Sequence, residues 1–306
     1  MCNMKYGKIS DFSKVNFTLP ENTDFTNKLL SKIEGKKEAL NVYSGCTGWS
    51  MKEWVGNYYP LGTRSNDFLT HYSRQFNTIE LNTTYYRIPD LKTVQKWVSQ
   101  TPENFRFAPK IPQIISHQKQ LSLRESYIEQ FCEAVSGLGN RLGISFLQLP
   151  PNFGPADLST LDSFLKRFPI EAIPLSVEIR NEIWLNDNTE INLLNEMLEH
   201  YGAGTVMSDV AGNRAALHMN LCNETVMIRF VGNELDTTDF SRLDDWVLRL
   251  KNWIESGIKT IYFFHHQEEN MLAPEICSYF NKKMNELCDS SLIIPKKYNH
   301  EQLSLF

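Results

Sequence analysis

Eight short apolar segments alternate with helical patterns along most of the chain, and this alternation constrains the fold more than any other feature. Each segment has the length and the β-branched or aromatic content of a buried strand. Strands that alternate with helices build parallel sheets, so the pattern predicts a (β/α)8 TIM barrel in a single α/β domain. The predicted strands cover residues 42–46, 76–81, 105–110, 144–149, 175–180, 203–208, 225–231 and 259–264.

A doubly wound open sheet is the alternative arrangement of the same elements. Neither a G-x-G-x-x-G sequence nor a P-loop follows any predicted strand, which weakens the nucleotide-binding version of that alternative. The segment 210–224, between the sixth and seventh strands, is weakly helical at best, so the sixth helix of the barrel is missing from its expected place.

Polar and ionisable side chains gather where the predicted strands end. In a barrel these carboxyl ends meet at one mouth, where active sites are built. A structural alternative is that the groups only neutralise one another, but burying so many of them is costly unless they are paired or used. We therefore expect an active site made from Glu80, Asn82, Lys110, Gln148, Glu178, Arg180, Asp209, Arg229 and the pair His265–His266.

The types of these residues limit the chemistry of the predicted site. Lysine and arginine side chains suit a phosphate or carboxylate group on the ligand, and carboxylates offer general acid or base roles. The predicted catalytic residues are Glu80, Lys110, Glu178 and Asp209. The predicted substrate-binding residues are Asn82, Tyr85, Tyr86, Gln148, Arg180, Arg229, Trp49 and His265.

A divalent metal is an open alternative for the same mouth, with Glu178, Asp209 and His265 as candidate ligands. Adjacent histidines on a strand point to opposite faces, so at most one of His265 and His266 is expected to bind a metal. The six cysteines contain no C-x-x-C pair and no spacing typical of a metal site or a disulfide framework. The sequence therefore leaves the cofactor unknown, with a divalent metal as the open alternative.

Charge and hydropathy exclude some classes of protein. The formal net charge is −5, so no overall positive field holds nucleic acid, and any such binding has to be local. No apolar run is long enough to span a bilayer, and no apolar signal segment stands at the start. With scattered cysteines, these features favour a reduced, cytoplasmic setting.

Three parts of the chain are distinguished by their composition. Residues 1–41 form a polar N-terminal extension with one helical pattern at 24–33, and its expected place is the bottom or side of the barrel. Residues 42–290 form the barrel. Residues 291–306 are predicted to be a flexible tail, because Pro295, Lys296 and Lys297 give it the composition of a linker.

Six short motifs of the predicted barrel resemble those of the DUF72 family, the YecE-like proteins. They are G-x-x-G-W at 45–49, E-L-N-T-T-Y-Y at 80–86, F-x-F-x-x-K at 105–110, Q-L-P-P-x-F at 148–153, E-x-R at 178–180 and R-F-V-G at 229–232. The resemblance covers about residues 42–280 and implies a TIM barrel, but no defined reaction. This chain departs from the family at Val231, where histidine is more frequent, and at His265 and His266, where asparagine is more frequent.

The last five residues, QLSLF, resemble the peptide by which bacterial proteins bind the sliding clamp. In that interpretation two or three apolar side chains occupy a groove on the clamp and a glutamine forms hydrogen bonds at its rim. The alternative is a tail that folds back on its own barrel. The predicted partner-binding residues are Gln302, Leu303, Leu305 and Phe306.

Three functions are consistent with these features. The first is an enzyme, a phosphodiesterase-like hydrolase or a lyase or isomerase, that acts on a nucleic-acid or nucleotide phosphate and is recruited by the sliding clamp. The second is an enzyme for a small anionic metabolite such as a sugar phosphate or carboxylate. The third is a non-catalytic adaptor associated with the clamp. The analogy with other TIM-barrel enzymes concerns the fold alone.

Overall fold

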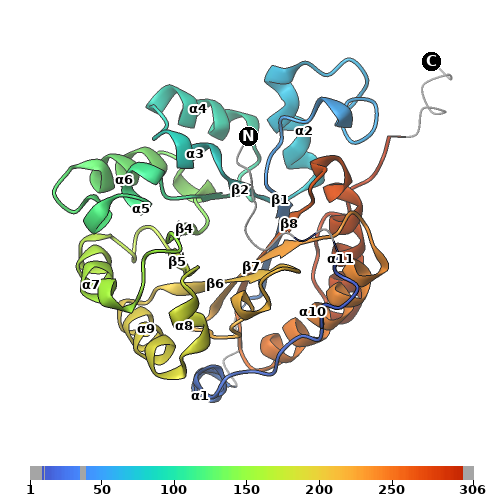
Figure 1. Cartoon of the computed structure of the whole chain (residues 1–306). Helices are drawn as coiled ribbons and strands as arrows, with labels where there is room; N and C mark the ends of the chain where they lie inside the picture. The colour runs from blue at the N-terminus through green and yellow to red at the C-terminus, as the bar shows by residue number, and fades with distance from the viewer. Residues whose placement is uncertain (1–8, 10, 35–38, 299–306) are drawn as a thin grey trace, which may run out of the picture.

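A computed structural model of the chain describes residues 9, 11–34 and 39–298. Eight parallel strands form one sheet in the order β3-β2-β1-β8-β7-β6-β5-β4, which curls into a nearly closed barrel seen along its axis in Figure 1. The prediction of a TIM barrel is confirmed. The strands are β1 (Asn41–Cys46), β2 (Thr78–Leu81), β3 (Arg106–Pro109), β4 (Ser145–Gln148), β5 (Leu175–Glu178), β6 (Gly204–Asp209), β7 (Thr225–Val231) and β8 (Thr260–His266).

The last seam of the barrel, between β3 and β4, is joined by two isolated bridges rather than a continuous ladder. Phe107 pairs with Leu142, and Lys110 pairs with Phe146, both in parallel. The backbone amide of Ile111 donates to the carbonyl of Phe146 at 2.9 Å. This seam closes the ring of strands and brings the end of β3 next to the end of β4.

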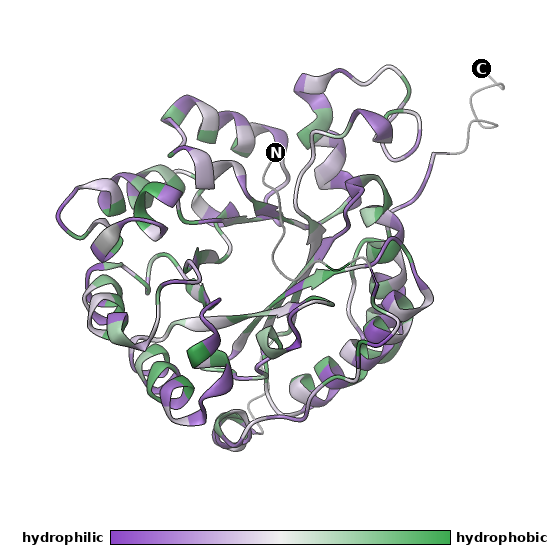
Figure 2. Ribbon diagram, viewed as in Figure 1, coloured by the Kyte–Doolittle hydropathy of each residue, from purple (hydrophilic) through white to green (hydrophobic). Residues whose placement is uncertain are grey.

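Most of the helices surround the barrel with one apolar face turned inward. In α10, for example, Leu243, Trp246, Val247 and Leu250 recur at helical spacing and are buried. Figure 2 shows hydrophilic residues along the outer faces of these helices. The helices are α1 (Asp24–Ile33), α2 (Phe68–Gln75), α3 (Thr83–Tyr86), α4 (Leu91–Gln100), α5 (Gln113–Ser116), α6 (Tyr127–Ser136), α7 (Leu158–Arg167), α8 (Glu182–Asn186), α9 (Asn188–Tyr201), α10 (Thr237–Glu255) and α11 (Ala273–Cys288).

The N-terminal helix α1 occupies the place that the missing sixth helix leaves in the ring. Between β6 and β7 the chain forms only the short 3-10 helix Arg214–Ala216, and α1 lies between α9 and α10 in Figure 1. The Thr26 hydroxyl donates to the carbonyl of Met219 at 2.7 Å and accepts from the amide of Leu221 at 2.9 Å. Residues 24–33 are therefore a structural part of the barrel wall.

Gly257 allows the turn after α10 to approach the end of α1 closely. Gly257 has φ +110°, and a Cβ there would lie 2.5 Å from the carbonyl oxygen of Ile33. A larger residue is excluded by both the backbone conformation and the available space. The turn after α10 and the end of α1 are thus fitted to each other.

The interior of the barrel on the side away from the mouth is filled by apolar and aromatic side chains. Tyr43 and Tyr262 stack with their ring centroids 4.7 Å apart. Above them the Arg229 guanidinium lies 5.6 Å from the centre of the Phe146 ring. The polar groups of the mouth therefore rest on a closed apolar plug and not on a water-filled channel. The buried plug residues are Ala108, Ile144, Phe146, Val206, Met227, Tyr262 and Phe264.

The first part of the predicted flexible tail is fixed on the barrel. The Gln75 side chain exchanges two hydrogen bonds with the backbone of Lys296, at 3.0 and 3.1 Å. Asn281 and Asn285 bind the carbonyls of Ile293 and Leu292. The sequence predicts flexibility from residue 291, but side-chain amides on α2 and α11 satisfy the backbone of 292–296. The peptide 302–306 lies outside the described residues.

Among the described residues, no helix combines the length and the apolar character that crossing a bilayer requires.

Candidate functional site

The alternation of side chains along the strands selects which of the predicted residues reach the mouth. Glu80 on β2, Glu178 on β5 and Arg229 on β7 all point into the barrel near the carboxyl ends of their strands, where they meet one another. Their neighbours along the same strands point outward to the helices. The mouth is therefore built from residues that are far apart in sequence but equal in height along the barrel axis.

Arg229 joins the two carboxylates. Its guanidinium donates two hydrogen bonds to Glu80, with Nε 2.9 Å from Oε2 and Nη2 3.0 Å from Oε1. Its third contact runs from Nη1 to Oε2 of Glu178 at 2.8 Å. All three side chains are buried, so these charge-assisted bonds form in a low-dielectric environment.

Glu178 has two further partners. Arg180 donates from Nε and Nη2 to Oε1 of Glu178, at 3.1 and 3.0 Å. The Ser208 hydroxyl lies 3.3 Å from the same oxygen. We call Glu80, Glu178, Arg180 and Arg229 the ion cluster.

Both carboxylates of the ion cluster are ionised. Burial opposes ionisation, but it is outweighed at Glu80 by Arg229 and His266, which hold its pKa well below the usual range. At Glu178 burial is outweighed by Arg180 and Arg229, and its pKa lies at about 2. Groups fixed in the ionised form suit electrostatic positioning of a ligand better than proton transfer near neutral pH.

Asn82 and His266 complete the surroundings of Glu80. Asn82 Nδ2 donates to Oε1 of Glu80 at 2.8 Å, and His266 Nε2 lies 3.0 Å from Oε2. Burial, opposed by Glu80, lowers the pKa of His266. Its Nδ1 is buried and has no hydrogen-bond partner in the described part of the chain. A neutral His266 that donates to Glu80 therefore offers an acceptor nitrogen.

Lys110 differs from the arginines of the ion cluster, because no carboxylate of the described residues forms an ion pair with it. Its Nζ donates to Oε1 of Gln148 at 2.9 Å and lies 4.2 Å from the centre of the Tyr85 ring. Burial, reinforced by the charge of Arg229, lowers the pKa of Lys110 to about 8. A lysine in this state exchanges protons near neutral pH.

Tyr85 contacts His117, a residue that was not among those predicted from the sequence. Its hydroxyl lies 3.3 Å from Nε2 of His117, whose Nδ1 lies 2.8 Å from the Ser116 hydroxyl. Burial and the positive charges of Lys110 and Arg180 lower the pKa of His117. His117 belongs to the loop after β3, and a histidine in such a loop is the only sequence signal for it. Tyr86, beside Tyr85, is 53% exposed.

Asp209 does not face the mouth, in contrast to the expectation from the sequence. It lies on the outer side of β6, where Arg242 donates to Oδ1 at 2.7 Å and Trp246 Nε1 donates to Oδ2 at 2.8 Å. Arg214 also contacts Oδ1. The inward position at this height belongs to Ser208, so Asp209 joins β6 to α10 instead of binding a ligand.

His265 also points outward, and His266 takes the inward place on β8. His265 Nε2 lies 3.1 Å from the Ser44 hydroxyl, and its ring packs 5.3 Å from that of Phe280 on α11. Burial lowers its pKa to about 3, so it stays neutral. The three candidate metal ligands Glu178, Asp209 and His265 therefore do not converge. Within the described ranges no group of three or more His, Cys, Asp or Glu side chains is arranged to hold a metal ion.

Trp49 is half-buried and packs edge-on against Trp97 of α4, with ring centroids 6.2 Å apart. Its carbonyl accepts from the Tyr59 hydroxyl at 2.8 Å. These contacts assign Trp49 to the packing of the β1–α2 loop on α4.

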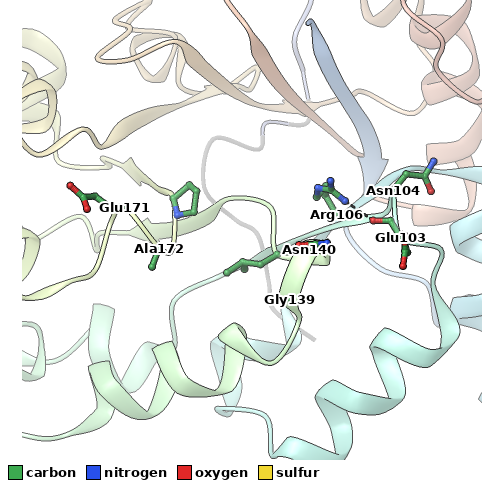
Figure 3. Close-up of a pocket in the computed structure, with 9 residues that line it drawn as sticks. Glu103, Asn104, Arg106, Gly139, Asn140, Glu171 and Ala172 are labelled. Carbon is green, nitrogen blue, oxygen red and sulfur yellow. Dashed lines mark hydrogen bonds between the residues drawn. The ribbon is translucent and has the colours of Figure 1, made fainter.

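A surface hollow lies at the other end of the barrel (Figure 3). Its lining includes Arg106, the first residue of β3, and residues that precede β4 and β5, such as Asn140 and Glu171. Arg106 Nη1 there donates to the carbonyl of Glu103 at 2.8 Å. Because these residues stand at the amino ends of the strands, the hollow contains none of the predicted site residues. In TIM barrels this end serves stability rather than catalysis.

The fold and the mouth define a parallel (β/α)8-barrel protein with a buried ion cluster and a lysine of lowered pKa. The chain belongs to the DUF72 family of proteins of unknown function, whose sequence profile matches residues 43–298. The resemblance inferred from the six motifs is confirmed.

Two relatives show how far the similarity extends. The UPF0759 protein YecE of Escherichia coli K12 is 32% identical over 253 residues, which are 77% of this chain and 89% of that protein. The UPF0759 protein YunF of Bacillus subtilis strain 168 is 28% identical over 151 residues, which are 47% of this chain and 52% of that protein.

Solved structures of DUF72 proteins share the fold. One from Enterococcus faecalis V583 aligns with a TM-score of 0.64 at 19% identity, over 83% of this chain and 100% of that chain. One from Thermotoga maritima MSB8 aligns with a TM-score of 0.61 at 21% identity, over 80% of this chain and 99% of that chain. At this identity the likeness concerns the fold alone.

Proposed function

We propose that the protein is an enzyme that binds a phosphate-containing ligand, a nucleotide or nucleic-acid phosphate, at the carboxyl-end mouth of the barrel. The observation that carries this proposal is the environment of Lys110. Its ammonium group is buried at the mouth, and its hydrogen bond is to the neutral amide of Gln148. A buried cation without a carboxylate partner is costly, and an anionic ligand removes that cost.

The charge balance of the mouth supports an anion. Two carboxylates, Glu80 and Glu178, face three cations, Lys110, Arg180 and Arg229. Arg229 is paired with both carboxylates and Arg180 is paired with Glu178, so the cation in excess is Lys110. A phosphate supplies more acceptor oxygens than a carboxylate and matches a lysine and an arginine together.

The second candidate, an enzyme for a small anionic metabolite, uses the same residues. Nδ1 of His266, buried and without a partner in the described part of the chain, favours a ligand with a hydroxyl donor beside its anionic group. Sugar phosphates and nucleotides both satisfy this requirement, so the size of the ligand distinguishes the two candidates.

Thermal unfolding with a panel of ligands tests the proposal. Nucleotides, short oligonucleotides, sugar phosphates and matched carboxylates are compared with sodium chloride of equal ionic strength. We expect a phosphate compound to raise the melting temperature of the wild type but not of Lys110→Met, because linkage requires binding to the folded state. Lys251→Met, on the outer side of α10, is the control. Equal stabilisation of Lys110→Met, or none by any phosphate, would contradict the proposal.

We further propose that Gln302, Leu303, Leu305 and Phe306 bind the bacterial sliding clamp and bring the mouth to DNA. The sequence pattern supports this, and so does the anchoring of the preceding chain, since the amide of Tyr298 donates to the carbonyl of Asn57 at 2.6 Å. Recruitment by a peptide supplies what a net charge of −5 does not. Without recruitment, the same barrel is an enzyme for a small anionic metabolite. With recruitment but an inactive mouth, the protein is a non-catalytic adaptor on the clamp.

Calorimetry with the sliding clamp of the same organism tests recruitment. We expect micromolar binding by the full chain and none after deletion of residues 302–306. Leu305→Ala/Phe306→Ala should lose binding as well, whereas Ser304→Asp, which changes no anchor, should retain it. Unchanged binding after the deletion would exclude the peptide as the contact.

A further inference from the structure

We propose that Lys110 is a nucleophile that forms an imine with an aldehyde or ketone carrying an anionic group. The inference deepens the proposed function and rests on anion binding at the same mouth. It follows from the position of Lys110 directly after β3, from the neutral groups that contact its Nζ, and from a hydroxyl–imidazole pair beside it.

The surroundings of Nζ ease the loss of its proton, so the ammonium group that attracts the anion can become the neutral amine that attacks the carbonyl. A lysine that only holds charge normally touches a carboxylate, whereas Nζ here contacts the Gln148 amide oxygen at 2.9 Å and the rings of Tyr85 and Phe146. The nearby carboxylates of Glu80 and Glu178 are bound by the arginines of the ion cluster. Desolvation beside another cation is the arrangement by which enzymes activate lysine for attack on carbonyls.

The amount of reactive amine is large for a lysine. A pKa of about 8 instead of 10.5 leaves roughly 300 times more neutral amine at pH 7 than an exposed lysine has. The larger fraction of neutral amine adds to the geometric argument and distinguishes Lys110 from an exposed lysine.

Tyr85 and His117 supply the proton transfers that imine formation needs. The Tyr85 ring covers Nζ, with its centre 4.2 Å away, and its hydroxyl lies 3.3 Å from Nε2 of His117. His117 is held from its other nitrogen by the Ser116 hydroxyl at 2.8 Å. A phenol in contact with an imidazole donates and recovers a proton without leaving the site. The Tyr85 ring has to turn aside to admit a substrate, because Lys110 is only 5% exposed.

The chemical step is balanced without an oxidant or reductant. The lone pair of Nζ forms a bond to the carbonyl carbon as the π bond of the carbonyl breaks, and one of the two Nζ protons moves to the oxygen to give a carbinolamine. That oxygen then leaves as water, with one proton from Tyr85, and the nitrogen loses its remaining proton to the Tyr85–His117 pair. One carbonyl and one amine thus give one imine and one water.

The substrate class follows from two requirements of the site, an anionic group for its cations and a carbonyl group for its amine. Arg180 and the positive charge around Lys110 select an anionic group, and the imine requires a carbonyl within a few atoms of it. Phosphorylated hydroxyaldehydes and ketones have this chemistry. So does the ring-opened deoxyribose of an abasic site in DNA, an aldehyde flanked by phosphates.

Trapping with sodium borohydride tests the inference, because the hydride reduces an imine to a stable secondary amine. The probes are glycolaldehyde phosphate and, in a second arm, an oligonucleotide with one abasic site. We expect one adduct per chain, located at Lys110 by peptide mass spectrometry, and competition by inorganic phosphate. Preferential trapping of either probe assigns the source of the carbonyl, and both results support an imine.

Two variants make the outcome decisive. Lys110→Arg keeps the positive charge but cannot form an imine, so it should bind phosphate and give no adduct. Tyr85→Phe keeps the ring over Nζ but removes the hydroxyl, and the rate of trapping should fall at least ~10-fold. No adduct at Lys110, or equal labelling in Lys110→Arg, would overturn the inference. If phosphate binds but no imine is trapped, only the imine inference is overturned. If an imine is trapped but no phosphate binds, the proposed function is overturned instead.

Discussion

Arg229 on β7 binds Glu80 on β2 through two parallel hydrogen bonds of 2.9 and 3.0 Å across the interior of the barrel. The two strands are separated in the sheet by β1 and β8, so this contact is not a product of neighbouring strands. It connects opposite parts of the ring at the height of the mouth. The ion cluster therefore connects distant strands of the barrel at the level of the mouth.

Replacing Arg229 with methionine should destabilise the protein strongly. The substitution keeps much of the side-chain volume but leaves Glu80 and Glu178 buried without their shared cation, and breaking a buried pair in this way costs about 3–5 kcal/mol. Urea denaturation followed by circular dichroism measures the loss. Lys32→Met is the control, because the pair of Lys32 with Glu199 is exposed and should contribute little. A loss equal to that of the control would contradict a role in holding the barrel together.

The sequence predicts the barrel and the ion cluster because both depend on strong local patterns. Apolar strands that end in polar residues locate Glu80, Glu178 and Arg229 without knowledge of their partners. Their pairing is then a consequence of the parallel register, which places the carboxyl ends of all strands at one end. The same reasoning places Lys110 beside Gln148, since β3 and β4 are neighbours at the seam.

The outward direction of Asp209 and His265 was not predictable because strand parity changes with every residue. Successive side chains of a strand point to opposite faces. An error of one residue in the predicted strand therefore assigns its inward side chains to the outside and its outward side chains to the inside. Ser208 and His266 take the inward places, and no local signal in the sequence distinguishes them from their neighbours. The place of α1 in the ring depends on contacts with residues near 220, almost 200 positions away in sequence.

Substituting Thr26 with alanine should destabilise the barrel through the N-terminal helix. The hydroxyl joins the carbonyl of Met219 and the amide of Leu221, and without it both backbone groups stay buried and unpaired. The expected loss is about 1–3 kcal/mol of unfolding free energy, measured by urea denaturation. Thr26→Ser keeps the hydroxyl and should lose clearly less. Equal losses in the two variants would show that the methyl group, not the hydrogen bonds, holds α1 in place.

His265 should make the protein less stable in acid. Its pKa is lowered by burial to about 3, so the unfolded chain takes up a proton as pH falls below about 6.5 while the folded chain does not. Its contribution to stability is therefore complete above pH 6.5 and is lost as pH falls toward 3, by about 1.4 kcal/mol for each unit of pH.

The variant His265→Gln tests this contribution, because its side chain retains an amide near Ser44 but does not titrate. The neighbouring His266 and the two carboxylates of the ion cluster also weaken the fold in acid, so the comparison is of slopes between pH 6 and 4, not of absolute stabilities. We expect a shallower slope for the variant in urea denaturation. Parallel slopes for wild type and variant would mean that His265 is protonated in the folded protein.

Phosphate binding at the mouth should weaken as pH rises through about 8. Burial and the charge of Arg229 lower the pKa of Lys110 to that value, so the free protein loses the ammonium charge just above neutral pH, while phosphate binding favours the charged form. A phosphate monoester is already a dianion there, since its second pKa is about 6, and the loss therefore reports the protein. Calorimetric titrations with a phosphate ligand between pH 6.5 and 9.5 should show an affinity that falls by up to tenfold per unit of pH above 8.

The variant Lys110→Arg is the control, because it keeps its charge throughout this range and its affinity for phosphate should stay level. A fall of the same size in Lys110→Arg would assign the titrating group to another residue, and a level wild-type profile would place Lys110 outside the anion site.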